Sequence, residues 1–271
     1  MSANHAAFNL IFRFVENYIS PIAGRISSQR HVMAIRDGFI SAMPFMIVGS
    51  FLLVFAYPPF SPDTTWGFAR AWLDLAKEFE GRILTPFDMT MGIMSIYICA
   101  AISYNLGKHY EKSNQLDPFM CAMLSIMAFL LIAAPKTNGT LPVDSLGGTG
   151  IFTAILVAIY CVEMMRFLKA HNIGISLPDQ VPPMIKNSFD LLMPVLGGVL
   201  TLYPLSVLMQ SQLGMLIPQA IMSIFKPLVS AAESLPAILL AVLIGHLLWF
   251  AGIHGAAIVS GMLQMFWLTN L

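Results

Sequence analysis

The sequence predicts an all-α polytopic membrane protein with five N-terminal transmembrane helices, an amphipathic linker helix and the start of a second membrane domain. Three observations support this fold class. First, 57% of the 271 residues are hydrophobic and only 10% are charged, whereas soluble domains carry roughly 25% charged residues. Second, the mean hydropathy is +0.76. Third, the apolar residues gather in segments about as long as the roughly 20 residues that a helix needs to cross a bilayer.

These apolar segments define the first domain, residues 1–209. The segments that are long and apolar enough to be spans are residues 38–57, 86–106, 118–135, 148–168 and 188–209. Ahead of them, residues 8–31 place Phe and Ile on one stripe and Arg, Glu and Asn off it, which predicts an amphipathic helix along the cytoplasmic surface. We therefore expect the first domain to begin at the membrane surface and to contain five spans.

Two further regions follow these spans. In residues 210–233, Gln, Lys and Glu are spaced among Met, Leu and Ile, a pattern typical of an amphipathic helix at the membrane interface, and we expect a linker there. Residues 234–271 form the start of the second membrane domain. Within it, residues 235–251 are strongly apolar, whereas 254–268 form a run so short that we expect it to re-enter or lie flat rather than to cross.

The distribution of basic residues predicts a cytoplasmic N-terminus. Nine Lys and Arg lie in segments on the same side of the membrane as the N-terminus: Arg13, Arg25, Arg30, Arg36, Lys108, Lys112, Arg166, Lys169 and Lys186. Four lie in the loops of the opposite side: Arg70, Lys77, Arg82 and Lys136. Because cytoplasmic loops carry the excess of basic residues, this comparison places the N-terminus inside. The formal net charge of +0 argues against nucleic acid as a partner.

The three cysteines, Cys99, Cys121 and Cys161, all lie within apolar segments. An odd number in such positions indicates small core residues rather than disulfides, and their spacing matches no metal site. We accordingly expect no metal and no cofactor.

Ionisable side chains in or beside the spans each need an explanation, because a charge at membrane depth is costly. Asp88 and Asp190 lie near the starts of predicted spans, where we expect capping or surface roles. Glu163 lies one turn before Arg166 near the cytoplasmic end of a span, and we expect these two side chains to form an ion pair that reaches the interface.

The loop of residues 134–150, APKTNGTLPVDSLGGTG, has two interpretations between which the residues do not decide. It contains several turn-forming residues, and its Asn138-Gly139 pair is a strong turn signal, so one interpretation is a simple connection between spans. The other is a segment that folds back into a central cavity, where Lys136 and Asn138 donate hydrogen bonds to a hydroxyl-rich ligand.

The stretch LLWFAGIHG, residues 247–255, places a Trp and a His beside glycines in an apolar region. The glycines that bracket His254 permit backbone bends and a close approach to a ligand. The neutral imidazole of His254 can accept a proton from a hydroxyl group, and the indole of Trp249 offers a flat apolar face for stacking on a sugar ring. The alternative is a structural role, with His254 hydrogen-bonded within a helix bundle and Trp249 serving as an interfacial anchor.

Several stretches of the chain together resemble one family of membrane proteins. They are HVMAIRDGFISAMPFMIVGSFLLV, MTMGIMSIYICAAISYNLGKHY, ISLPDQVPPMI followed by KNSFDLLMPVLGG, and LLWFAGIHGA. Over essentially all 271 residues, the chain resembles the membrane subunits (enzyme IIC) of the lactose/cellobiose/diacetylchitobiose family of sugar phosphotransferase systems.

This resemblance implies a multi-pass homodimer in the bacterial cytoplasmic membrane, in which the first five spans form a scaffold for dimerisation and the linker leads to a transport domain. It implies a permease for a β-disaccharide such as cellobiose, diacetylchitobiose or lactose, with IIB and IIA subunits as partners, the separate IIB subunit phosphorylating the sugar 6-hydroxyl. The family histidine that faces this hydroxyl matches His254, the catalytic candidate. The implied substrate-binding residues are His254, Trp249 and Asn138.

The chain departs from the family pattern in one respect. Members are longer and carry a Glu in a downstream NEP segment that faces the same hydroxyl, whereas these 271 residues contain no NEP segment and their last Glu is Glu233. We therefore expect a truncated or split permease that cannot transport alone. The alternative hypothesis is a non-transporting scaffold or regulatory remnant that dimerises in the membrane.

Overall fold

A computed structural model describes most of the chain from Ser28 to Phe250. The described residues are 13, 17, 21, 24–25, 28–135, 139–175, 178, 180–182, 185, 189–232 and 234–250, with only the backbone described for 247–250. Nine helical elements are placed within these ranges: α3 (Arg30–Ala56), α4 (Gly67–Asp88), α5 (Met94–Asn114), α6 (Pro118–Ala133), η2 (Gly148–Gly150), α7 (Ile151–Ala170), α9 (Leu192–Leu213), α10 (Ile217–Ala232) and α11 (Leu235–Phe250). The prediction of an all-α protein is confirmed.

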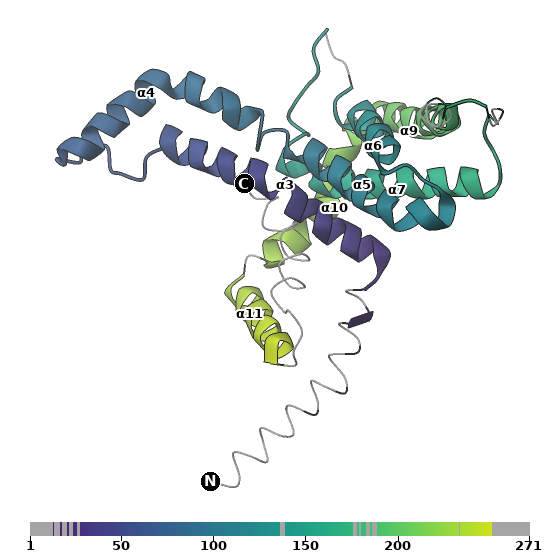
Figure 1. Cartoon of the computed structure of the whole chain (residues 1–271). Helices are drawn as coiled ribbons and strands as arrows, with labels where there is room; N and C mark the ends of the chain where they lie inside the picture. The colour runs from purple at the N-terminus through teal and green to yellow at the C-terminus, as the bar shows by residue number, and fades with distance from the viewer. Residues whose placement is uncertain are drawn as a thin grey trace.

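Helix α5 forms the centre of a helical bundle (Figure 1). It packs against α3, α6 and α7, while α9 packs on α6 and α7. The α3–α5 contact is close because Gly38 has no side chain: a Cβ there would lie 2.9 Å from the backbone nitrogen of Ile102. Small residues at such crossings let membrane helices approach closely. The bundle core therefore depends on α5. The C-terminal residues of this helix are polar.

Local signals fix the turn between α5 and α6. Helix α5 ends at Gln115, whose φ of 53° lies in the left-handed region. Asp117 then caps α6, because its carboxylate accepts hydrogen bonds from the backbone N–H groups of Phe119 at 2.8 Å and Met120 at 3.2 Å. Pro118 occupies the first helical position, which suits its fixed φ.

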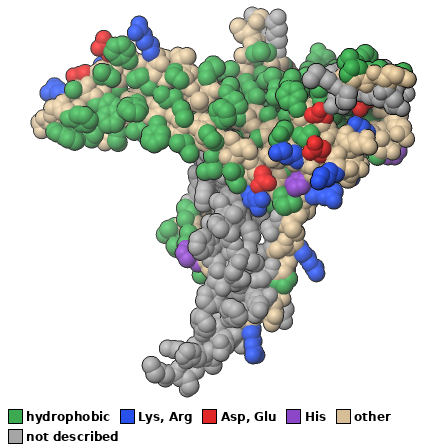
Figure 2. Space-filling view, viewed as in Figure 1, with side chains coloured by type: hydrophobic (Ala, Val, Ile, Leu, Met, Phe, Trp, Pro, Cys, Tyr) green, Lys and Arg blue, Asp and Glu red, His purple; other side chains and the backbone are tan. Residues whose placement is uncertain are grey.

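An arm extends from the bundle, formed by the C-terminal part of α3 and by α4 (Figure 1). Its helices are joined by ring contacts among Phe55, Phe60, Trp66, Phe68 and Trp72, with centroids 5.4–6.0 Å apart. Figure 2 shows charged side chains along the upper edge of the arm and hydrophobic ones over most of its visible face. Helix α4 is thus amphipathic, with one polar and one apolar side.

The bounds of the second predicted span, residues 86–106, are wrong. Residues 86–88 end α4, and α5 begins only at Met94. The break has a hydrogen-bonding cause: the carbonyl oxygen of Phe87 accepts from the N–H groups of Met91 at 2.9 Å and Gly92 at 3.1 Å, which closes α4 with a turn. Helix α4 lies where a loop is predicted, because its charged residues leave no apolar segment long enough for a span.

Three of the described helical segments are long and apolar enough to cross a membrane: α3, η2 with α7, and α9. A fourth span is possible if α10 and α11, bent by 75° at their junction, count as one. Helix α6 has only 16 residues, and α5 has a polar C-terminal part. Within the described residues, length and composition therefore support three of the five predicted spans, and up to four spans in all.

The polar residues of the core confirm one prediction. Cys99, Cys121 and Cys161 are free and buried. Two buried hydroxyls meet beside them, with 2.5 Å between Oγ of Ser103 and Oγ of Ser125. Hydrogen bonds of this kind hold membrane helices together.

The described part of the 134–150 loop docks on the bundle. The side chain of Ser95 donates to the carbonyl oxygen of Gly147 at 2.5 Å, and its backbone N–H donates to that of Leu146 at 2.9 Å. Ser145 and Leu146 are buried. The second half of this loop is therefore packed against the start of α5 rather than being an exposed connection.

Candidate functional site

The residues predicted to contact sugar lie outside what the structure describes. Asn138 and His254 are among the undescribed residues, and Trp249 is described only as part of the α11 backbone. The described histidine nearest to them in the sequence, His246, is exposed, and its Nδ1 lies 2.8 Å from the carbonyl oxygen of Val242. The sugar site consequently remains a prediction from sequence.

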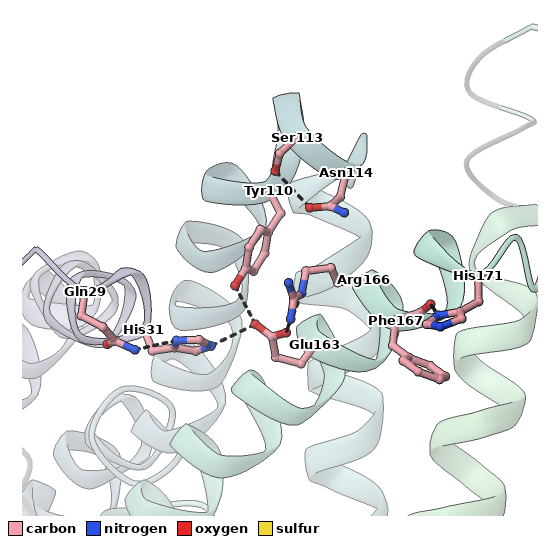
Figure 3. Close-up of polar contacts among 9 residues, drawn as sticks. All are labelled: Gln29, His31, Tyr110, Ser113, Asn114, Glu163, Arg166, Phe167 and His171. Carbon is pink, nitrogen blue, oxygen red and sulfur yellow. Dashed lines mark hydrogen bonds and ion pairs between the residues drawn. The ribbon is translucent and has the colours of Figure 1, made fainter.

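The largest polar network in the described part of the chain surrounds Glu163 on α7. We call Gln29, His31, Tyr110, Glu163 and Arg166 the Glu163 cluster (Figure 3). The Tyr110 hydroxyl donates to Oε1 of Glu163 at 2.7 Å, and Nε2 of His31 lies 2.9 Å from the same oxygen. Arg166 binds the other oxygen, with both Nε and Nη2 at 2.6 Å. Each oxygen of this carboxylate therefore has two partners.

The hydrogen bonds of His31 indicate which of its ring nitrogens carries a proton. The backbone N–H of Val32 donates to Oε1 of Gln29 at 2.9 Å, which turns the amide NH₂ of Gln29 toward His31. Since that NH₂ can only donate, Nδ1 of His31 is the acceptor at 2.9 Å, and Nε2 carries the proton that it donates to Glu163. A neutral imidazole satisfies every contact in this arrangement.

Two guanidinium groups flank Tyr110. The Cζ atom of Arg166 lies 5.0 Å from the centre of the Tyr110 ring, and that of Arg30 lies 5.5 Å from it. These distances are within the range of cation–π contacts. The Glu163 cluster and Arg30 thus join the first turn of α3, the last turns of α5 and the C-terminal half of α7.

A second polar contact lies nearby at the end of α7. Nζ of Lys169 donates to a carboxylate oxygen of Asp190 at 3.1 Å and to the carbonyl oxygen of Gln115 at 2.7 Å. A cavity of about 190 Å³ adjoins this pair. Its lining is mainly apolar: Leu116, Met165, Leu168, Lys169, Asn172, Ile173, Gly174, Ile175, Asp190 and Pro194.

Within the described residues, no three His, Cys, Asp or Glu side chains are placed to hold a metal ion. The hydrogen bonds of the Glu163 cluster join α3, α5 and α7 and hold these helices in register.

The predictions for the ionisable residues can be compared with these contacts. The Glu163–Arg166 ion pair and the surface position of Asp190, half-exposed beside Lys169, are confirmed. Asp88 is the last residue of α4 and is exposed, instead of standing at the start of a span. His31 and Tyr110 were not predicted as partners, because 132 and 53 residues separate them from Glu163 and no local pattern reports such contacts.

The family follows from comparison with known proteins. Residues 36–271 match the family described as "Phosphotransferase system, EIIC". The chain belongs to this family. It is a multi-pass membrane protein of the bacterial phosphotransferase type, related to the cellobiose, lactose and chitobiose IIC components.

Individual relatives agree with this assignment. A cellobiose-specific EIIC component of Geobacillus stearothermophilus is 32% identical, with 95% of this chain and 58% of the relative covered. A lactose-specific EIICB component of Streptococcus mutans is also 32% identical, with 89% and 42% covered. The crystal structure of ChbC, the IIC component of an N,N'-diacetylchitobiose-specific phosphotransferase system, superimposes with a TM-score of 0.80 at 32% identity, covering 94% of this chain and 60% of ChbC.

The coverage is unequal on the two sides of each comparison. Nearly all of this chain is matched, while the chain spans about 60% of the length of ChbC and 58% of the cellobiose relative. The resemblance in sequence and the shared fold therefore concern one part of these longer proteins.

Proposed function

We propose that the chain is the sugar-specific IIC permease subunit, or part of it, of a phosphoenolpyruvate-dependent phosphotransferase system for a β-disaccharide. One observation carries the proposal: the TM-score of 0.80 and 32% identity to ChbC extend over 94% of the chain. The names of these relatives include cellobiose, lactose and diacetylchitobiose specificities. They support the substrate class without selecting one disaccharide.

The proposed organisation follows the predicted domains. Residues 1–209 form a scaffold of five spans through which two copies dimerise, 210–233 form the linker, and 234–271 begin the transport domain. Contacts of α10 with η2, α7 and α6 support a linker that docks on the scaffold. The Phe152 and Phe225 rings stack at 4.2 Å and add to this contact.

The proposed setting is the bacterial cytoplasmic membrane with the N-terminus inside. The Glu163 cluster, Lys169 and the start of α3 then lie at the cytoplasmic end of the bundle. IIB and IIA proteins are the proposed partners, and the EIICB name of the lactose relative joins a IIC and a IIB component in one protein.

For the reaction, we assign His254 as the group that accepts or steers the proton of the sugar 6-hydroxyl during phosphoryl transfer from IIB. Trp249 and Asn138 are assigned to sugar binding. Since the glutamate that shares this site in the family is not among these 271 residues, we propose that they do not transport sugar by themselves. The alternative function is a dimerising scaffold without transport, supported by a core that lies mainly in α3, α5, α6 and α7.

A chimera tests the proposal. This chain replaces the corresponding region of the Geobacillus cellobiose-specific EIIC, and uptake of labelled cellobiose is measured in vesicles supplied with the soluble phosphotransferase proteins. We expect phosphorylated cellobiose to accumulate with the chimera and not with the 271 residues alone. In the chimera, His254→Ala should lower accumulation by about 100-fold or more, as expected for loss of an acid–base group.

His246→Ala is the matched control and should keep the activity of the chimera, because its exposed ring hydrogen-bonds to the carbonyl oxygen of Val242 in its own helix. Equal accumulation by the His254→Ala chimera would refute the assignment of His254. A correctly inserted chimera that never accumulates sugar would favour the scaffold without transport.

A further inference from the structure

The two guanidinium groups at Tyr110 are arranged as an anion site. Arg30 comes from α3 and Arg166 from α7, yet both lie within 5.5 Å of the centre of one ring. The ring belongs to a residue that is only 3% exposed, so its position is fixed by the core. The Arg30 residue and the Arg166 side chain are exposed, the latter to 45%. One buried aromatic ring thus has an accessible guanidinium group from each of two helices beside it.

The charges of Arg30, Arg166 and Glu163 beside Tyr110 do not cancel. Glu163 is the carboxylate that pairs with Arg166, and both of its oxygens are already fully engaged. Among the described residues, no carboxylate lies within ion-pair distance of Arg30. His31 contributes no charge in its neutral form. Two positive charges therefore face one negative charge, and the excess is exposed at the surface.

The location points to the membrane surface. At the same end of the bundle, Lys108 lies over the Tyr104 ring at 4.7 Å, and His171 packs against Phe167 with ring centroids 4.2 Å apart. Pairs of aromatic and basic side chains of this kind are typical of the level of lipid headgroups. Along α3, Ile40, Met43 and Val48 are 51%, 39% and 52% exposed, so a surface for acyl chains begins about three turns from Arg30.

We propose that Arg30 and Arg166 bind the phosphate group of an acidic phospholipid. A guanidinium group matches phosphate oxygens with two parallel N–H donors, which favours arginine over lysine at such a site. Basic sites between membrane helices are known to select anionic headgroups on the cytoplasmic side. The Glu163 cluster has a second role in this proposal, because it orients Arg166 toward the headgroup. The proposed lipid site does not depend on which disaccharide the protein binds.

Thermal unfolding in lipid nanodiscs tests it. The protein is placed in discs of phosphatidylcholine alone and in discs that also contain phosphatidylglycerol, and the unfolding midpoint is compared. We expect phosphatidylglycerol to raise the midpoint of the wild type and Arg30→Gln to lose at least half of that rise. Arg30→Lys should recover only part of it, because an ammonium group lacks the paired donors. Equal midpoints in phosphatidylcholine show that the variants fold.

Lys112→Gln is the matched control, since it removes an exposed cation from the end of α5 without touching Tyr110. An equal loss of the rise in Lys112→Gln would overturn the site, because the effect would then be one of general surface charge. Inorganic phosphate added to phosphatidylcholine discs separates the two sources of phosphate. A rise as large as that with phosphatidylglycerol would overturn the assignment to lipid. So would an Arg30→Gln variant that keeps its full response to phosphatidylglycerol but loses binding of the soluble IIB protein.

Discussion

The two ends of α3 lie in contrasting environments. At its start, His31 joins the Glu163 cluster, and Ala34, Gly38 and Phe39 are buried against the bundle. Toward its end, Phe51 is 63% exposed and Phe55 is 55% exposed in the arm. The more buried start carries Arg30, His31, Arg36 and Asp37, whereas the exposed end is apolar, so composition does not explain the difference. What distinguishes the ends is whether neighbouring helices of the same chain are available to pack against them.

This contrast predicts where the chain is sensitive to substitution. In the bundle, side chains have little space and polar groups have fixed partners, so small changes should be costly. In the arm, α4 packs mainly on α3 and many side chains face outward, so equivalent changes should matter little. Matched substitutions in the two regions test this difference in sensitivity.

The largest effect is expected for Gly38→Ala. The new methyl group would collide with the side chain of Ile102 and lie 2.9–3.0 Å from its backbone atoms, so α3 and α5 would have to separate. We expect the free energy of unfolding to fall by about 3 kcal/mol, the upper part of the usual range for overpacking. Unfolding by denaturant in detergent measures it. A loss no greater than that of an arm substitution would contradict the contrast.

Glu163→Gln should have the next largest effect. The neutral amide removes the charge that Arg166 pairs with and presents donor hydrogens to groups that themselves donate. Because the Glu163 side chain is 25% exposed, water offsets part of the loss, and we expect about 1–2 kcal/mol of destabilisation. Glu111→Gln, on the exposed end of α5, serves as the control and should be nearly neutral. Equal effects of the two substitutions would show that the cluster adds no stability.

Much of the fold could be predicted because helices that span a membrane appear in the sequence as long apolar segments. The segments 118–135 and 148–168 correspond closely to α6 and to η2 with α7. The bounds of α5 could not be predicted in this way. Its start follows the turn in which the carbonyl oxygen of Phe87 accepts from the N–H groups of Met91 and Gly92, and its last residues are polar and largely exposed, so no apolar segment marks either bound.

The polar site was predictable only within one helix. The three-residue spacing of Glu163 and Arg166 places them on one face, and the ion pair followed from it. The addition of His31, Tyr110 and Arg30 depends on how three helices pack, which no local pattern encodes. His254, Trp249 and Asn138 differ again: they were assigned through the family motif and stay predictions.

Gly81→Ala is the counterpart of Gly38→Ala in the arm. No atom lies within 4 Å of the position that its Cβ would take, and the residue stands in the interior of α4. Alanine favours the helix over glycine, so we expect stability to rise by about 0.5–1 kcal/mol. The same substitution thus has opposite signs in the two regions. A loss of stability comparable to that of Gly38→Ala would mean that the arm is packed as closely as the bundle.

The smallest effect concerns Tyr57, just beyond the end of α3. Its hydroxyl donates to a carboxylate oxygen of Glu80 at 2.9 Å, and this hydrogen bond, together with the negative charge of Glu80, raises the pKa of Tyr57 above its usual value near 10. A raised pKa means that the folded arm favours the neutral phenol. The contribution of the bond is therefore present below about pH 10 and is lost as the pH rises through the higher pKa.

Phenolate absorbance, taken as the difference between wild type and Tyr57→Phe, measures this titration, and Glu80→Gln should return the pKa toward the ordinary value. Titration of Tyr57 at or below that value in the wild type would mean that the hydrogen bond between Tyr57 and Glu80 is absent, leaving the bond from Nε1 of Trp72 to the carbonyl oxygen of Phe55 to join α3 and α4 in the arm.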